Sequence, residues 1–126
     1  MVKYKYNNVR PDGDHMPDCV IRAISLAMDI PYYEVVILLY ENGWTYDCDS
    51  LCISCYEKLL DRYFKLEHYN GNDIPIVDIL EDFPNDVLIL RIEGHLTCAI
   101  NGTINDIWDC RYEKCTDFWL VKLKSK

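Results

Sequence analysis

The sequence predicts one α+β domain over residues 1–126, with N-terminal helices packed on a C-terminal antiparallel β-sheet. Apolar side chains recur at helical spacing in the first half of the chain, and short β-prone runs replace them from Val87 onwards. An Asn101-Gly102 pair between two of these runs is typical of a tight hairpin. Half of the 126 residues are apolar, which is enough for a single hydrophobic core.

The helices are predicted from their start and stop signals. Pro17 and Asp18 mark a helix start, with Asp18 as the N-cap or a first-turn acid. Cys19 therefore falls in the first turn of this helix, which also carries the first long apolar face. A second helix is expected to end at Gly43. The later helices are expected over these ranges: 31–42, 50–62 and 76–82.

The strands are predicted from short β-prone runs between turn residues. An alternating pattern near the N-terminus indicates a short edge strand, followed by a loop rich in Asn, Pro, Gly and Asp. The change of period in the last third indicates the sheet itself. The expected strands cover residues 2–6, 87–92, 95–100, 103–108 and 118–123.

Charge and composition exclude several kinds of partner. The formal net charge is −8, which disfavours binding to the phosphates of nucleic acids. No run approaches the ~20 apolar residues that cross a bilayer, and no signal peptide opens the chain, so no membrane partner is predicted. We therefore expect a cytoplasmic protein. Its seven cysteines would be buried groups, metal ligands or nucleophiles rather than disulfides, and no cofactor is predicted.

Cys19 is a candidate nucleophile because of its place at the start of a helix. Unpaired N–H groups and aligned peptide dipoles at a helix N-terminus lower the pKa of a thiol. The same N–H groups, including that of Cys19, can hold an oxyanion. His95 opens a predicted strand, which is a rigid position suited to a catalytic base. His15, close to Cys19 in the sequence, is an alternative base.

The predicted hairpin brings a carboxylate towards His95. With a two-residue turn at Asn101-Gly102, His95 pairs with Trp108 and shares a sheet face with Asp106. A bulge or a three-residue turn would instead place Asp109 directly opposite His95. Either carboxylate could accept a hydrogen bond from the imidazole and fix its tautomer. Asp109 is the preferred acid, and Asp106 is the alternative.

Three segments of the chain resemble papain-like cysteine peptidases: residues 18–25 around the cysteine, 94–100 around the histidine and 105–109 around the acid. The resemblance is closest to small members encoded by bacteriophages and bacteria, and it extends to the peptidase domains that trim bacteriocin leaders. In that family the cysteine begins the central helix, the histidine leads a strand, and an Asp or Asn ends the next strand.

This resemblance implies a papain-like fold and a hydrolase with Cys19, His95 and Asp109 as its triad. The substrate would be a protein or peptide, cleaved at a peptide or isopeptide bond through a thioester. The compartment would be the cytoplasm of a bacterium, or of a host cell for a phage-encoded protein.

The chain departs from this family in the oxyanion hole. Papain relatives usually carry a Gln about six residues before the cysteine, whereas this chain has Gly13 there and contains no Gln. Asn7 or Asn8 could bend back to donate instead. The departure leaves a second function open: a papain-like fold with weak or no catalysis that binds a protein, for example a phage inhibitor of a host protein.

Cys48, Cys52 and Cys55 form a C-x₃-C-x₂-C cluster that could ligate a metal ion. Two close thiolates and a distant pair are common in structural zinc sites. The distant ligands would come from Cys110, Cys115 and His68. The spacing also matches the iron–sulfur motif of radical SAM enzymes, but those need a far larger barrel domain. Buried cysteines on one helix face are the preferred interpretation, and a small zinc-stabilised interaction domain is the alternative.

Overall fold

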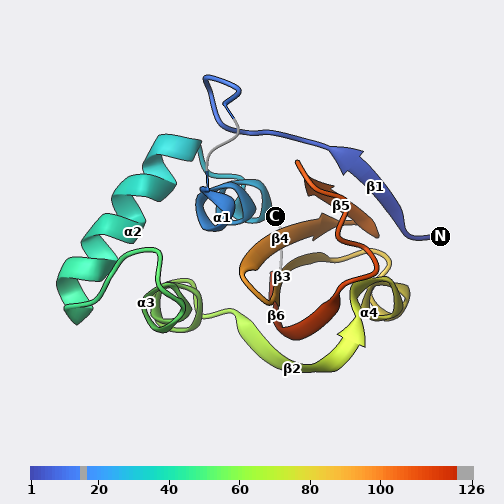
Figure 1. Ribbon diagram of the computed structural model, residues 1–126. Helices are drawn as coiled ribbons and strands as arrows, with labels where there is room; N and C mark the ends of the chain where they lie inside the picture. The colour runs from blue at the N-terminus through green and yellow to red at the C-terminus, as the bar shows by residue number, and fades with distance from the viewer. Residues whose placement is uncertain (15–16, 122–126) are drawn as a thin grey trace, which may run out of the picture.

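A computed structural model describes residues 1–14 and 17–121, which form an α+β fold with four α-helices and a six-stranded sheet (Figure 1). The predicted α+β class is thereby confirmed. The elements in chain order are β1 (Lys3–Tyr6), α1 (Cys19–Met28), α2 (Tyr32–Tyr46), α3 (Ile53–Lys58), the π-helical turn η1 (Leu59–Tyr63), β2 (Glu67–Pro75), α4 (Ile76–Asp82), β3 (Val87–Ile92), β4 (His95–Ile100), β5 (Thr103–Asp106) and β6 (Lys114–Val121).

The sheet has the strand order β1-β5-β4-β3-β6-β2. Neighbouring strands run antiparallel except β1, which pairs in parallel with β5, so the prediction of a purely antiparallel sheet is wrong at this edge. β3 and β4 are almost continuous apolar runs because both faces of these central strands are buried. β1, near the N-terminus, thus pairs with β5, about 100 residues later in the chain, and its hydrogen bonds hold the backbone of β5 in place.

A two-residue turn sets the register between β4 and β5. Asn101 and Gly102 both have positive φ, at 50° and 75°, as a type I′ hairpin turn requires. Ile100 therefore pairs with Thr103, which confirms the predicted two-residue turn. Because side chains alternate along a strand, this register decides which residues of β5 share a face with the start of β4.

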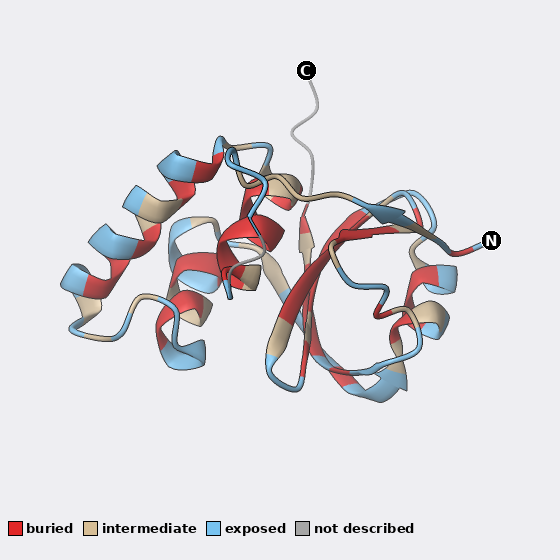
Figure 2. Ribbon diagram, turned by 45° about the horizontal axis from the view of Figure 1, so that its top comes forward, coloured by how far each residue is buried: buried red, intermediate tan, exposed pale blue. Residues whose placement is uncertain are grey.

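Helices cover both faces of the sheet. α1 lies between α2 and the sheet, and α4 covers the opposite face (Figure 1). One core lies under α1, α2 and α3, and it includes Ile24, Leu39 and Trp119. The other core lies under α4 and includes Leu80 and Leu88. The central strands and α1 are mostly buried, whereas the outer side of α2 is exposed (Figure 2).

No single helix in residues 1–14 and 17–121 has the length and apolar character needed to cross a membrane. α1 and α2 meet those criteria only when counted together, and the chain bends by 113° between them.

α2 is longer than predicted. It continues past Gly43 to Tyr46 and ends at Asp47, which takes a left-handed conformation with φ 52°. Gly43 lies instead inside the helix, where the following loop packs against it. A Cβ at this position would be only 2.9 Å from the carbonyl oxygen of Cys48 and from Ser50 Oγ. The glycine is thus explained by a close approach of two backbones and not by a helix stop.

The sequence analysis did not predict β2, whose side chains are mostly polar and exposed. β2 is an edge strand on β6, and a bulge between Asn70 and Ile74 interrupts its register. Asn72 and Asp73 have positive φ in this bulge. β5 is shorter than predicted, and the part of the predicted last strand beyond Val121 lies outside the described residues.

A disulfide joins Cys48 to Cys55 and closes the loop between α2 and α3. The expectation that the cysteines form no disulfide is therefore wrong for this pair, and a zinc ion held by both thiolates is excluded while they are bonded. Cys52 is a free, exposed thiol. The predicted third helix starts only at Ile53 and becomes π-helical at Leu59.

Candidate active site

Cys19 is the first residue of α1 and is partly buried in the wall of a pocket. The first intrahelical hydrogen bond runs from the N–H of Arg22 to the carbonyl of Asp18. The N–H groups of Cys19, Val20 and Ile21 therefore have no acceptor within the helix. The side chain of Asp18, predicted as the cap, does not bond to them. Within residues 1–14 and 17–121, these backbone donors beside the thiol have no hydrogen-bond acceptor.

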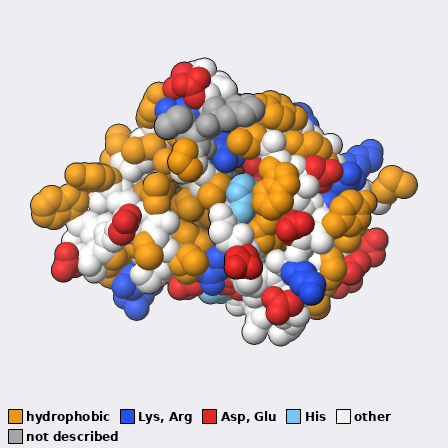
Figure 3. Space-filling model, in the orientation of Figure 1, with side chains coloured by type: hydrophobic (Ala, Val, Ile, Leu, Met, Phe, Trp, Pro, Cys, Tyr) orange, Lys and Arg blue, Asp and Glu red, His pale blue; other side chains and the backbone are white. Residues whose placement is uncertain are grey.

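His95 opens β4 directly after a two-residue turn in which Gly94 has φ 70°. β4 packs on α1, so the His95 ring and the Cys19 thiol line the same pocket and interact. The ring of Trp108 packs edge-on against His95, with centroids 5.0 Å apart. A histidine is visible at the surface in Figure 3, among hydrophobic side chains. The alternative base His15 lies outside the described residues.

Asp106, at the end of β5, holds the other side of the His95 ring. Its Oδ2 lies 2.6 Å from Nε2 of His95. Its Oδ1 accepts hydrogen bonds from Arg22 Nη1 at 2.9 Å and from the N–H of Ile107 at 2.7 Å. With Nε2 engaged by a buried carboxylate, Nδ1 is the ring nitrogen left for Cys19.

The structure does not bring Asp109 to His95, which corrects the preferred acid of the sequence analysis. Asp109 is exposed, and its two carboxylate oxygens accept hydrogen bonds from Arg111, each at 2.9 Å. No bulge shifts the register after the Asn101-Gly102 turn, so Asp106 keeps the His95 face of the sheet. Asp106, the alternative acid, therefore occupies the orienting position.

The electrostatics of the site favour a thiolate beside an imidazolium. Burial raises the pKa of Cys19, but hydrogen bonding with His95 and with the backbone of Leu96 outweighs it, so the pKa lies below the ordinary thiol value. Burial lowers the pKa of His95, but hydrogen bonds with Asp106 and Cys19 dominate and raise it to about 9. Burial also raises the pKa of Asp106, yet bonding to His95 keeps it below its usual range.

Arg22 ties the acid to the helix that carries the nucleophile. Its Nε donates to Asp18 at 2.7 Å and its Nη1 to Asp106 at 2.9 Å, and all three side chains are buried. The second oxygen of Asp18 accepts from the hydroxyl of Tyr32 at 2.5 Å, and Arg10 donates to that hydroxyl at 2.8 Å. The sequence analysis missed this network; its only local signal is the spacing of four residues between Asp18 and Arg22.

The pocket next to Cys19 and His95 has a volume of about 190 Å³. It is large enough for one side chain of a substrate, and its walls are mostly apolar. Arg91 also lines the pocket, and its guanidinium forms ion pairs with Asp117 and Glu57. The other lining residues are Val20, Leu51, Ile53, Tyr56, Ile92, Gly94 and Leu96.

Comparison with protein-family models, curated proteins and solved structures found no match. The chemistry of the site is therefore argued from its own geometry.

Neither asparagine suggested for the oxyanion hole is directed to that role in the structure. The side-chain amide of Asn7 donates to Asn105 at 3.1 Å. That of Asn8 donates to the carbonyls of Gly13 and Asp14, also at 3.1 Å. Among the described residues, the donors beside the thiol are the backbone N–H groups at the start of α1, and Arg91 adds a guanidinium to the pocket wall.

One group of side chains has the composition of a metal site: His95, Asp106 and Cys110, whose ligand atoms lie within 4.8 Å of one another. Asp106 already accepts hydrogen bonds from His95 and Arg22. Burial raises the pKa of Cys110 to about 12, so its thiol is protonated when no metal ion is bound. The arrangement fits a hydrogen-bonded triad better than a metal centre.

Proposed function

We propose that the protein is a cysteine hydrolase of papain-like architecture that acts on peptide or isopeptide bonds. The observation that carries the proposal is the alignment of three groups: a thiol at a helix N-terminus, the His95 imidazole, and a buried carboxylate 2.6 Å from that ring. These are the parts that nucleophilic catalysis by a thiolate requires. Cys19 is the nucleophile, His95 the general acid and base, and Asp106 the orienting acid.

The reaction begins when the Cys19 thiolate attacks the substrate carbonyl carbon. The resulting oxyanion accepts hydrogen bonds from backbone N–H groups at the start of α1. The His95 imidazolium gives its proton to the leaving amine, the carbon–nitrogen bond breaks, and a thioester remains on Cys19. Neutral His95 then takes a proton from water, whose oxygen attacks the thioester and releases the carboxylic acid and the thiolate.

The oxyanion site also supports a second candidate, a protein-binding role with little or no turnover. Loss of a single oxyanion donor typically costs ~10²–10³ in rate, and the chain has no Gln to supply one. The amides of Asn7 and Asn8 are already engaged by other acceptors. We therefore expect slow hydrolysis compared with an enzyme that has a complete oxyanion hole.

Hydrolysis of p-nitrophenyl acetate tests the proposal without knowledge of the natural substrate. The expected result is a burst of p-nitrophenolate, acetylation of Cys19 in peptide mass spectra, and continued turnover. Cys19→Ser should remove all three signals, and His95→Ala should slow both the acetylation of Cys19 and the hydrolysis of the thioester. Cys52→Ser is the matched control, because this thiol is exposed and outside the pocket.

Acetylation of Cys52 at the same rate as Cys19, or activity retained by Cys19→Ser, would contradict the hydrolase. A stable acetyl-Cys19 that never turns over would favour the binding role.

A further inference from the structure

Four large apolar side chains form a stripe along the outer side of α2, named here the α2 stripe: Tyr33, Ile37, Tyr40 and Trp44. They are 57%, 56%, 64% and 79% exposed. Their spacing of four, three and four residues places them on one side of the helix, and the opposite side is buried in the core. A contiguous exposed apolar surface of this kind marks an interaction site.

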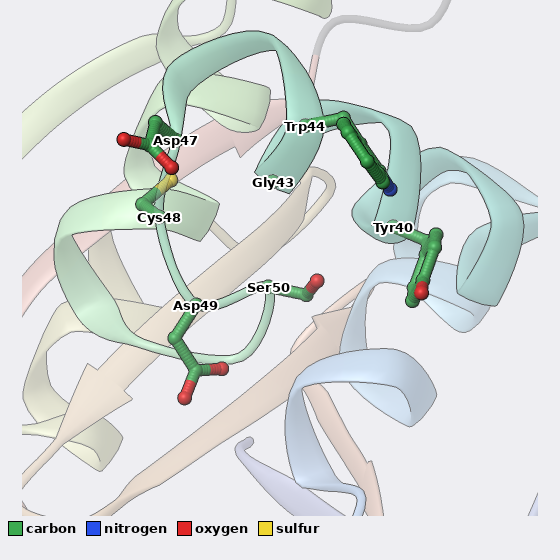
Figure 4. Close-up of a pocket in the computed structure, with 7 residues that line it drawn as sticks. All are labelled: Tyr40, Gly43, Trp44, Asp47, Cys48, Asp49 and Ser50. Atoms are coloured by element: carbon green, nitrogen blue, oxygen red, sulfur yellow. The ribbon is translucent and has the colours of Figure 1, made fainter.

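Two hollows border the α2 stripe. One, of about 360 Å³, lies beside Ile37 and extends to Phe64. The other, of about 530 Å³, lies at the C-terminal end of the stripe, with Tyr40 and Trp44 on one side and loop residues 47–50 on the other (Figure 4). The apolar stripe is therefore not a flat surface, since it has concave sites along its edges.

The larger hollow is built into the fold. The loop that forms its second wall meets α2 at Gly43, where there is no room for a Cβ. The disulfide between Cys48 and Cys55 ties the same loop to α3. A wall held at both points exists before any partner binds, which lowers the ordering cost of association.

The charged side chains of α2 itself and of the loop that follows it are all negative, whereas Lys58 and Arg62 lie over the ring of Tyr46 at the C-terminal end of α2. α2 contains Glu34 and Glu41 and no Lys or Arg, and Asp47 and Asp49 follow in the loop. Within residues 1–14 and 17–121, the carboxylate of Asp47 takes part in no hydrogen bond or ion pair, while its backbone N–H donates to the carbonyl of Gly43. In the same residues, the carboxylate of Asp49 accepts from the backbone N–H of Leu51 at 3.2 Å and forms no ion pair. These carboxylates are therefore free to meet positive charge from outside.

We propose that the α2 stripe docks an amphipathic helix of a partner protein, with apolar side chains on its inner face and Lys or Arg on its flanks. The stripe extends over twelve residues, about 16 Å from the first Cα to the last, which matches three turns of a helix. A second copy of α2 is disfavoured because its acidic flanks would face one another. A membrane rich in anionic lipid is disfavoured by the same charges and by the net charge of −8.

This docking surface is independent of the proposed hydrolase. Binding to the α2 stripe requires neither Cys19 nor His95, so its measurement stands whether or not the protein turns over a substrate.

The test uses two synthetic helical peptides of about 14 residues that share one leucine face and differ only in flanking Lys or Glu. Calorimetry should give a Kd of roughly 10–100 μM for the Lys peptide and binding at least ~10-fold weaker for the Glu peptide. Ile37→Ser and Tyr40→Ser should each raise the Kd of the Lys peptide by ~10-fold. Tyr112→Ser, equally exposed but outside α2, should leave it unchanged.

Further measurements distinguish a partner helix from a second copy of the chain and from a membrane surface. Asp47→Asn with Asp49→Asn should weaken the Lys peptide by ~2–5-fold and reduce its salt dependence. Equal affinity for both peptides, or equal effects of Tyr112→Ser and Tyr40→Ser, would overturn the proposal. So would self-association abolished by Ile37→Ser, or binding to phosphatidylserine vesicles with no binding of the Lys peptide.

Discussion

The substitution Asp106→Asn removes the carboxylate charge from the His95 ring while it keeps the size of the side chain. In the native protein Oδ2 of Asp106 lies 2.6 Å from Nε2 of His95 in a buried setting. An opposite charge at this distance favours the charged imidazolium, whereas burial favours the neutral ring. Without the carboxylate, burial lowers the pKa of His95, and only the weaker interaction with Cys19 opposes this effect.

The magnitude follows from the pKa of His95, which is about 9 in the native protein. Loss of one close opposite charge lowers a pKa by about 1–3 units. At pH 8 the protonated fraction of His95 should then fall from roughly nine-tenths to half or less. The fraction of molecules in which an imidazolium stabilises the Cys19 thiolate falls by the same factor. Alkylation of Cys19 below pH 8 should therefore slow, because the thiolate is the reactive form.

NMR titration of the histidine ring protons measures this shift directly, and Asp109→Asn is the matched control. Asp109 is exposed and bonded to Arg111, so its substitution should leave the pKa of His95 unchanged. Thermal unfolding of both variants checks that they are folded, since Asp106 also bonds Arg22. A larger shift in Asp109→Asn than in Asp106→Asn would refute the assignment of the orienting acid.

Three other outcomes are expected. Arg22→Met should destabilise the protein by about 3–5 kcal/mol in urea unfolding, because it removes the buried guanidinium that Asp18 and Asp106 share; a change below ~1 kcal/mol would argue against a structural role for this ion pair. In Cys19→Ser, where no thiol titrates beside the ring, Asp106 still raises the pKa of His95, although less than in the native protein, where it is about 9 with Cys19 contributing. The stability that this gives is complete below about pH 6.5 and is lost as the pH rises through the folded-state pKa. The loss should reach at most about 3 kcal/mol by urea unfolding across that range, and a pH-independent difference from Cys19→Ser/His95→Gln would contradict it. Reduction of the Cys48–Cys55 disulfide should lower the free energy of unfolding by about 2–3 kcal/mol, measured with and without a phosphine reductant, and an unchanged midpoint would show that the loop is held by packing alone.

The sequence predicted best what local rules decide. The Asn101-Gly102 turn fixes its own backbone conformation, so the register of β4 with β5 followed from two residues. That register in turn placed Asp106 on the His95 face. Apart from β2, the order of helices and strands was likewise predictable, as was the position of Cys19 at a helix start, because each depends on a short stretch of chain.

The features that the sequence did not predict depend on contacts between distant segments. The parallel pairing of β1 with β5 joins the two halves of the chain, and no local pattern indicates it. The choice of Asp106 over Asp109 depended on the absence of a bulge, which only the assembled sheet decides. Arg22 looked like an ordinary helix residue, because its second partner lies 84 positions away.

The pairing of Cys19, as an activated thiol, with His95 is tested most directly by the rate of alkylation of Cys19 by iodoacetamide at pH 6.5, in wild type and His95→Ala, with the exposed thiol of Cys52 as the internal reference. In wild type, Cys19 should be labelled roughly 10-fold or more faster than Cys52, and His95→Ala should abolish this advantage. Labelling of Cys19 no faster than Cys52, or an advantage that survives His95→Ala, would contradict the pairing.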